Sequence, residues 1–125
     1  MRRDSNDKQW KEVKDKVYTR DNNRCRLLKV LNMKEALLLQ RNAGPYLRQI
    51  DPAHYISVSS DPAIIYDENN ICCLNHYSHS NLDSYKDPID GHSISQEEVD
   101  RWWIRILKGN ANQYNYLLKK DLIRG

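Results

Sequence analysis

Phenylalanine is absent from this 125-residue chain, and cysteine is scarce, with only three residues. Without Phe, aromatic packing has to come from three tryptophans and eight tyrosines. The cysteines, Cys25, Cys72 and Cys73, are odd in number and two are adjacent, which makes a poor disulfide framework. We therefore expect unpaired thiols and a reducing, cytoplasmic location.

The chain also lacks a run of about 18 apolar residues, the length that a membrane span requires. Its first ten residues contain no apolar core of the kind found in secretory signals. Repeats and low-complexity tracts are absent as well. With 39% hydrophobic and 30% charged residues, the composition is typical of a folded soluble protein. At this length we expect one domain over residues 1–125.

Neither sign of charge is in large excess, since 20 basic and 17 acidic residues give a net charge of +3. That bias is too weak to establish a polyanionic partner. Basic residues are frequent over residues 8–34, and acidic residues over residues 83–100. Such a division suits a protein with one phosphate-facing side, but solvated helix faces explain it equally well.

Apolar spacing and capping signals predict helices near both ends of the chain. Trp10, Val13 and Val17 lie three and four residues apart, which predicts a helix over residues 8–20 after a frayed arm at residues 1–7. Two capping-box patterns predict the starts of later helices. They are Asn32 with Glu35 and Ser95 with Glu98. Short apolar runs at residues 48–58 and 71–74 are the candidates for strands.

Chemically active side chains gather in the middle of the chain, where all four histidines lie between positions 54 and 92. Asp51-Pro52-Ala53-His54 is followed by Asn70, and nine residues after Asn70 comes His79. Asp83 follows His79 by four residues, so the two side chains share one face if this segment is helical.

This arrangement resembles the motif of the HNH (ββα-metal) endonuclease family, in a small phage-type branch. The motif has a His on a first strand, an Asn that opens a second strand and a His on the following helix. The resemblance implies an α+β fold with a two-stranded hairpin and a helix at about residues 48–86, flanked by N-terminal helices and by C-terminal helices at about residues 95–122. It also implies that His54 is the general base, that Asn70 orients it and that His79 binds a divalent cation.

Phosphodiester hydrolysis makes sense of these residue types. A water must lose a proton near neutral pH, and histidine has an unperturbed pKa suited to accept it. A cation neutralises charge on the attacked phosphate and on the leaving oxygen. Imidazole together with carboxylate oxygen suits one Mg²⁺ or Mn²⁺, with Zn²⁺ or Ni²⁺ as alternatives.

The expected metal site departs from the family pattern at one position, because Ala53 stands where most relatives have a metal-binding Asp or His. Asp51 is the nearest replacement. In a regular strand Asp51 would share a face with Ala53 and point away from His54, unless Pro52 redirects it. Asp83 is a further candidate ligand, although an ordinary acidic residue on a helix surface is an equally good interpretation.

Many HNH domains also hold a structural zinc between two Cys-x-x-Cys pairs. The corresponding positions here are Cys25, Leu28, Asn75 and Ser78. Because a structural zinc site needs four ligands, we expect no structural zinc. Cys72 and Cys73 lie on the expected second strand and are interpreted as buried small hydrophobes.

Several basic side chains are candidate contacts to nucleic-acid phosphates. They are Arg20, Arg24, Arg26, Lys29 and Arg48, with His76 as a further candidate. Each one has an ordinary surface role as its alternative, and His76 is more simply a helix-surface or capping residue. Trp102 and Trp103 are expected to divide between core and interface rather than to stack on bases.

The function implied by the resemblance is metal-dependent hydrolysis of DNA phosphodiester bonds, with one active site that nicks one strand at a time. The alternative is a catalytically weak or inactive binding module for nucleic acid or protein on the same scaffold. A zinc-binding interaction domain built on the His cluster is a third interpretation. We expect no organic cofactor and no membrane partner, and both a monomer and a homodimer fit the sequence.

Overall fold

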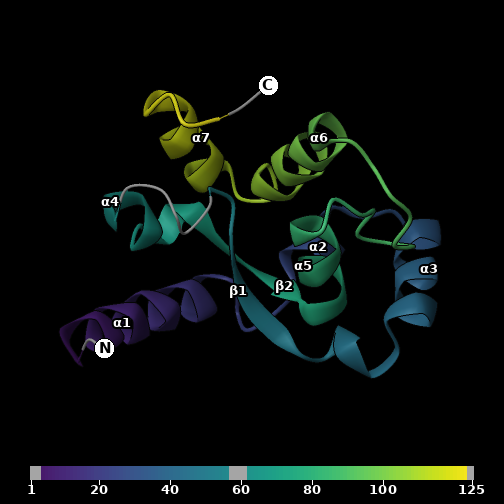
Figure 1. The fold of residues 1–125 in the computed structure, drawn as a ribbon, viewed down its shortest axis with the longest axis horizontal. Coiled ribbons are helices and arrows are strands. Elements are labelled where there is room, and N and C mark those ends of the chain that lie inside the picture. The colour runs from purple at the N-terminus through teal and green to yellow at the C-terminus, as the bar shows by residue number, and fades with distance from the viewer. Residues whose placement is uncertain (1–3, 57–61, 124–125) are drawn as a thin grey trace.

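The computed structural model describes residues 4–56 and 62–123, where helices surround a short hairpin (Figure 1). Along the chain the elements are α1 (Asp4–Arg20), α2 (Arg26–Val30), α3 (Met33–Ala43), the 3-10 helix η1 (Gly44–Leu47), β1 (Ile50–His54), α4 (Pro62–Ile65), the 3-10 helix η2 (Glu68–Asn70), β2 (Ile71–Asn75), α5 (His76–Asp83), α6 (Gln96–Leu107) and α7 (Ala111–Lys119). The expected α+β class is confirmed. Within the described ranges no helix combines the length and apolar character needed to cross a membrane.

The hairpin β1–β2 lies at the centre, and helices cover both of its faces (Figure 1). The strands pair antiparallel, so that Pro52 lies opposite Cys73 and Ala53 opposite Cys72. Because side chains alternate along a strand, these two pairs face opposite ways. Cys73 belongs to the small core under α1. Ala53 and Cys72 belong to the larger core that α6 and α7 complete. The predicted burial of both strand cysteines is confirmed.

Local capping signals predict the helix starts well. The side chain of Asn32 accepts a hydrogen bond from the backbone of Glu35, and the Glu35 side chain accepts one from the backbone of Asn32, so that α3 begins with a complete capping box. Ser95 and Glu98 do the same for α6. By contrast, α1 begins at Asp4, before the predicted start at residue 8.

Side chains, rather than a third strand, cover the outer edge of β2. Asp21 accepts a hydrogen bond from the backbone N–H of Cys73 at 3.0 Å, and Arg20 donates to the carbonyl of Ile71 at 2.6 Å. The Asp21 carboxylate is also bound by Arg20 at 2.8 Å and by Arg26 at 3.3 Å. These bonds occupy backbone groups that an edge strand otherwise leaves free for another chain.

Three of the four positions that the HNH resemblance matches to zinc ligands come together as a hydrogen-bonded cluster. The Cys25 sulfur accepts from the backbone and side-chain N–H groups of Asn75 at 3.2 and 3.3 Å. The Asn75 amide also donates to the Ser78 hydroxyl at 3.0 Å, and that hydroxyl donates to the Pro88 carbonyl at 2.8 Å. Leu28, the fourth position, is 37% exposed. The cluster joins the start of α2, the end of β2 and the first turn of α5.

Candidate metal and catalytic site

His54 ends β1 and is held from two sides. Its Nε2 atom lies 2.9 Å from the carbonyl oxygen of Ile65, and its ring stacks on Trp10 with the ring centroids 5.3 Å apart. A carbonyl oxygen can only accept, so Nε2 carries the proton and Nδ1 keeps a free lone pair. Burial lowers the pKa of His54, and the bond to Ile65 offsets this effect only in part. His54 is therefore neutral at pH 7 and able to accept a proton.

Asn70 supports the loop that holds His54. Its side chain is buried, accepts a hydrogen bond from the N–H of Ile56 at 2.7 Å and donates to the carbonyl of Ile56 at 3.1 Å. It also donates to the carbonyl of Ile64 at 3.2 Å, one residue before Ile65. Asn70 thus ties the end of β1 to the segment whose carbonyl binds the His54 ring.

Four side chains form an ionisable cluster on the other face of β1. The Oδ2 atom of Asp51 lies 2.7 Å from Nδ1 of His76 and 2.9 Å from Nδ1 of His79. The second ring nitrogen of His79, Nε2, lies 3.2 Å from Oδ2 of Asp83. The three residues expected to bind metal therefore lie together, and His76, expected as a phosphate contact, joins them.

The fold explains why these residues meet. Asn75 caps α5 directly after β2, so His76 and His79 occupy the first turn of the helix next to the hairpin. The backbone N–H of His76 donates to the carbonyl of Gln49 at 2.8 Å, which holds α5 against the start of β1. Asp51 faces α5 from β1, as strand alternation predicts.

His54 and two members of the cluster, His79 and Asp83, line one pocket of about 560 Å³, whereas Asp51 and His76 are not part of its lining. Its wall also includes Trp10, and Trp103 lies among its apolar lining. A proton acceptor and a carboxylate–imidazole pair thus share one open cavity.

Charge coupling sets the protonation of the cluster. Burial raises the pKa of Asp51, but hydrogen bonds from His79 and His76 outweigh it and leave that pKa below its usual value. Burial lowers the pKa of His79, yet the bonds to Asp83 and Asp51 raise it overall. Asp51 is therefore an anion over the working pH range, which is the state a metal ligand requires.

The donor set fits a divalent cation. Two ligand atoms that are each about 2.1 Å from a cation and at right angles are about 3.0 Å apart. The 2.9 Å separation of Asp51 Oδ2 and His79 Nδ1 is close to that value, and a cation there would replace the proton of the hydrogen bond that joins the two atoms. Carboxylate oxygen with imidazole nitrogen suits Mn²⁺, Mg²⁺ or Zn²⁺. Asp83 binds the opposite nitrogen of His79, so it would reach the same ion only after a rotation of one side chain.

Among the described residues, a different group brings three possible metal ligands close together. Asp87, Asp90 and His92 present atoms that all lie within 4.8 Å of one another. These residues lie in a turn, where Asp87 accepts from the N–H groups of Ile89 and Asp90 and stabilises the turn itself. The hydrogen bond to Asp90 raises the pKa of exposed His92. Local turn chemistry accounts for this group.

The basic candidates divide into two kinds. Arg26 is buried and bonds to Asp21, Gln113 and backbone carbonyls, and Arg20 bonds to Asp21 and to the β2 edge. These two arginines stabilise the fold in the observed conformation. The three others are exposed: Arg24, Lys29 and Arg48.

Two residues at the site had no signal in the sequence for the positions they take. Trp10 fitted the apolar stripe of α1, and nothing marked it as the residue that stacks on His54. His76 was expected at a helix start, and its bond to Asp51 spans 25 residues. The tryptophan pair behaves as expected, since Trp103 is buried and Trp102 packs at the edge of the core.

No protein-family model, no curated protein and no solved structure matches this chain.

Proposed function

We propose that this chain is a metal-dependent endonuclease of the HNH (ββα-metal) kind that hydrolyses DNA phosphodiester bonds and nicks one strand per event. The observation that carries the proposal is the pocket beside β1 that neutral His54 shares with His79 and Asp83, with Asp51 bonded to Nδ1 of His79. A proton acceptor next to a site for a divalent cation is what hydrolysis of a phosphodiester by water requires.

The order of elements supports the same proposal. The first His of the motif ends β1, Asn70 directly precedes β2, and His79 lies on α5, which follows β2 without a linker. Three of the four residues that correspond to family zinc ligands, Cys25, Asn75 and Ser78, lie next to one another and bond through an amide and a hydroxyl. This spatial agreement comes from positions that are about 50 residues apart.

The chemistry of the chain's own residues follows from their hydrogen bonds. With its Nε2 proton donated to Ile65, the ring of His54 uses Nδ1 to accept a proton from the attacking water. Stacking on Trp10 limits rotation of that ring and keeps it desolvated. Asn70 acts as a positioning residue through the loop. A divalent cation held by Asp51 and His79 supplies charge neutralisation for the attacked phosphate and its leaving oxygen.

A non-catalytic binding module is the second candidate, and one observation favours it. Both ring nitrogens of His79 already bond to carboxylates, of Asp51 and of Asp83, so the cluster is satisfied without an ion. Such a module would bind DNA without metal-dependent cleavage.

Cleavage of supercoiled plasmid distinguishes the two candidates. Wild type, His54→Ala and the matched control His92→Ala are each incubated with EDTA, Mg²⁺, Mn²⁺, Zn²⁺ or Ni²⁺. We expect metal-dependent nicking by wild type and His92→Ala, and a loss of about 10²- to 10⁴-fold in His54→Ala. If wild type binds DNA but nicks it with none of the metals, the nuclease proposal is overturned and the binding module is favoured.

A further inference from the structure

A second cavity, of about 740 Å³, lies where α1 turns into α2 and where the chain enters β1. We call it the basic groove, because its wall contains five cationic side chains and one carboxylate. They are Arg20, Arg24, Arg26, Lys29, Arg48 and Asp21. The groove thus carries a formal charge of +4, while the whole chain carries +3. The rest of the protein is close to neutral, so its positive potential is concentrated here.

Three of these cations have no partner within the described residues. The side chains of Arg24, Lys29 and Arg48 are exposed and form no ion pair or hydrogen bond with the described part of the chain. The one carboxylate cannot neutralise them, because Asp21 is 1% exposed and is already bound by Arg20 and Arg26. Unpaired cations around a concavity without a free acid favour a ligand with several negative charges.

The position of the basic groove relates it to the pocket of His54. Ile50 lines the groove and His54 lines the pocket, and the two residues are the ends of β1. A strand rises about 3.3 Å per residue, so the two sites are roughly 13 Å apart. Phosphates along one strand of a DNA duplex are about 3.4 Å apart along the helix axis. The separation of the two sites thus corresponds to about four nucleotides along one strand.

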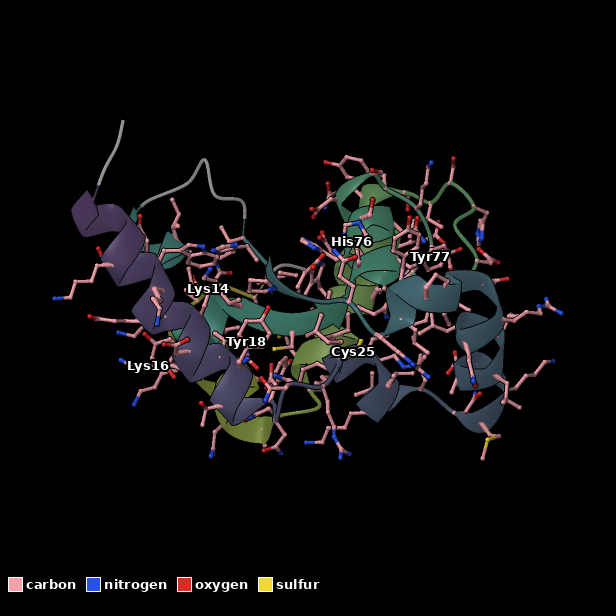
Figure 2. The ribbon with its side chains drawn as sticks, turned by 90° about the horizontal axis from the view of Figure 1, so that it is seen from below. Lys14, Lys16, Tyr18, Cys25, His76 and Tyr77 are labelled. Carbon is pink, nitrogen blue, oxygen red and sulfur yellow. The ribbon has the colours of Figure 1, made fainter. Side chains whose placement is uncertain are left out.

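Figure 2 shows Cys25, on the wall of the basic groove, and His76, beside Asp51, in the same view between α1 and α3. The hydrogen bond from Tyr18 to the Ile50 carbonyl, at 2.8 Å, fixes α1 against the start of β1 beside the groove.

We infer that the basic groove binds the phosphate backbone of the same DNA whose phosphodiester is hydrolysed in the pocket, about four nucleotides from the scissile bond. This inference rests on the proposed nuclease function. Arg24, Lys29 and Arg48 contact phosphates, while half-buried Arg20 and buried Arg26 add long-range attraction. Because only backbone is contacted, the groove contributes affinity and orientation without sequence preference.

The test is the salt dependence of binding to a labelled DNA duplex of about two helical turns, measured by fluorescence anisotropy in EDTA. Each phosphate contact contributes about −0.9 to the slope of log K against log salt. The triple variant Arg24→Ala/Lys29→Ala/Arg48→Ala should therefore reduce the slope by about 2 to 3 and weaken binding roughly 10- to 100-fold near physiological salt. The charge-retaining variant Arg24→Lys/Lys29→Arg/Arg48→Lys should keep the wild-type slope.

A matched control removes three exposed cations outside the groove: Lys34, Arg41 and Lys119. Its alanine triple variant should reduce the slope by less than about 1, although the loss of net charge is the same. Circular dichroism checks that both triple variants fold. If the groove triple variant does not fold, the three single groove variants replace it, and each is expected to reduce the slope by about 0.9.

The two proposals fail in different ways. Equal slopes for the groove and control variants would overturn the proposal that the basic groove binds DNA, even if wild type cleaves plasmid. A selective loss in the groove variant, without cleavage by wild type in any metal, would support the groove and overturn the nuclease. Absence of binding by wild type at low salt would overturn both.

Discussion

The two strands of the hairpin each have an aspartate beside them, and the two carboxylates differ in burial and in the number of bonds that they form. Along β2, Asp21 is fully enclosed and its carboxylate bonds to Arg20, Arg26 and the backbone of Cys73. Along β1, Asp51 is 19% exposed and shares a single oxygen between two imidazoles. The first arrangement is closed by bonds within the protein, and the second retains the capacity to exchange protons or accept a cation.

This difference indicates where stability and reactivity are located. A closed, buried ionic network is strongly destabilised when one member is removed, because the others become uncompensated buried charges. A half-exposed cluster beside a pocket loses little stability when it is altered, because water can replace its bonds. Substitutions at the β2 edge should therefore change folding, and substitutions at the β1 edge should change chemistry.

The largest expected effect is on stability, from Asp21→Asn. The variant leaves buried Arg26 with one less charged partner and should cost about 3–5 kcal/mol. Urea unfolding at pH 7 measures this change. The control is Asp15→Asn, since the Lys11–Asp15 pair is exposed and 3.5 Å long, and should cost less than about 1 kcal/mol. Similar losses for the two variants would show that the β2 edge is not the stabilising network described here.

Acid should remove the same contribution. Burial raises the pKa of Asp21, but hydrogen bonds from Arg20 and Cys73 and the charge of Arg26 outweigh it, so the folded pKa is lowered. A group with a lowered folded pKa stabilises the protein above its unfolded value of about 3.9 and loses that effect as the pH falls through the folded value. The stability difference between wild type and Asp21→Asn should be constant between about pH 5 and 8 and should shrink below about pH 4. A difference that stays constant down to pH 3 would contradict the assigned ionisation.

At the β1 edge, Asp51→Asn should affect cation binding rather than folding. Removing a charged ligand should weaken Mn²⁺ binding at least about tenfold, while the melting temperature stays within about 2 °C of wild type. Isothermal titration with Mn²⁺ and the Mn²⁺ dependence of nicking measure the change. Asp90→Asn is the control, because Asp90 also bonds to a histidine but makes no bond to the cluster of Asp51 and His79. Unchanged affinity in Asp51→Asn would leave Asp83 as the carboxylate ligand.

The contrast between the edges also explains what the sequence could predict. Caps such as Asn32 with Glu35 depend on neighbours three residues away, and both predicted capping boxes are present. The spacing of Asn70, His79 and Asp83 reflects one strand–helix unit, so the candidate ligands could be named from sequence. Whether they bind a cation stays a prediction.

Contacts between distant segments had no such signal. Asp21 directly follows the helix predicted over residues 8–20, and it bonds to a backbone group 52 residues away. Cys25 looked like the remnant of a lost site, and it accepts two hydrogen bonds from Asn75. Tertiary packing decides these partners, and neither periodicity nor capping patterns contain that information.

The smallest expected effect concerns Trp10, which belongs to the N-terminal helix but contributes to the β1 edge. Burial is the largest cause that lowers the pKa of His54, and the stacked indole of Trp10 supplies part of that burial. In Trp10→Ala the pKa of His54 should therefore rise toward about 6.5. Because the proposed base acts when neutral, the acidic limb of the pH–rate profile should move to higher pH. The rate should fall near pH 6 and below and change little near pH 8. Trp10→Phe should retain most of the effect, and Trp102→Ala, which removes a tryptophan packed on Arg105, should leave the limb in place. A limb that does not move, with stability reduced, would mean that Trp10 only packs α1 on the hairpin and that the loop around Ile65 sets the protonation of His54.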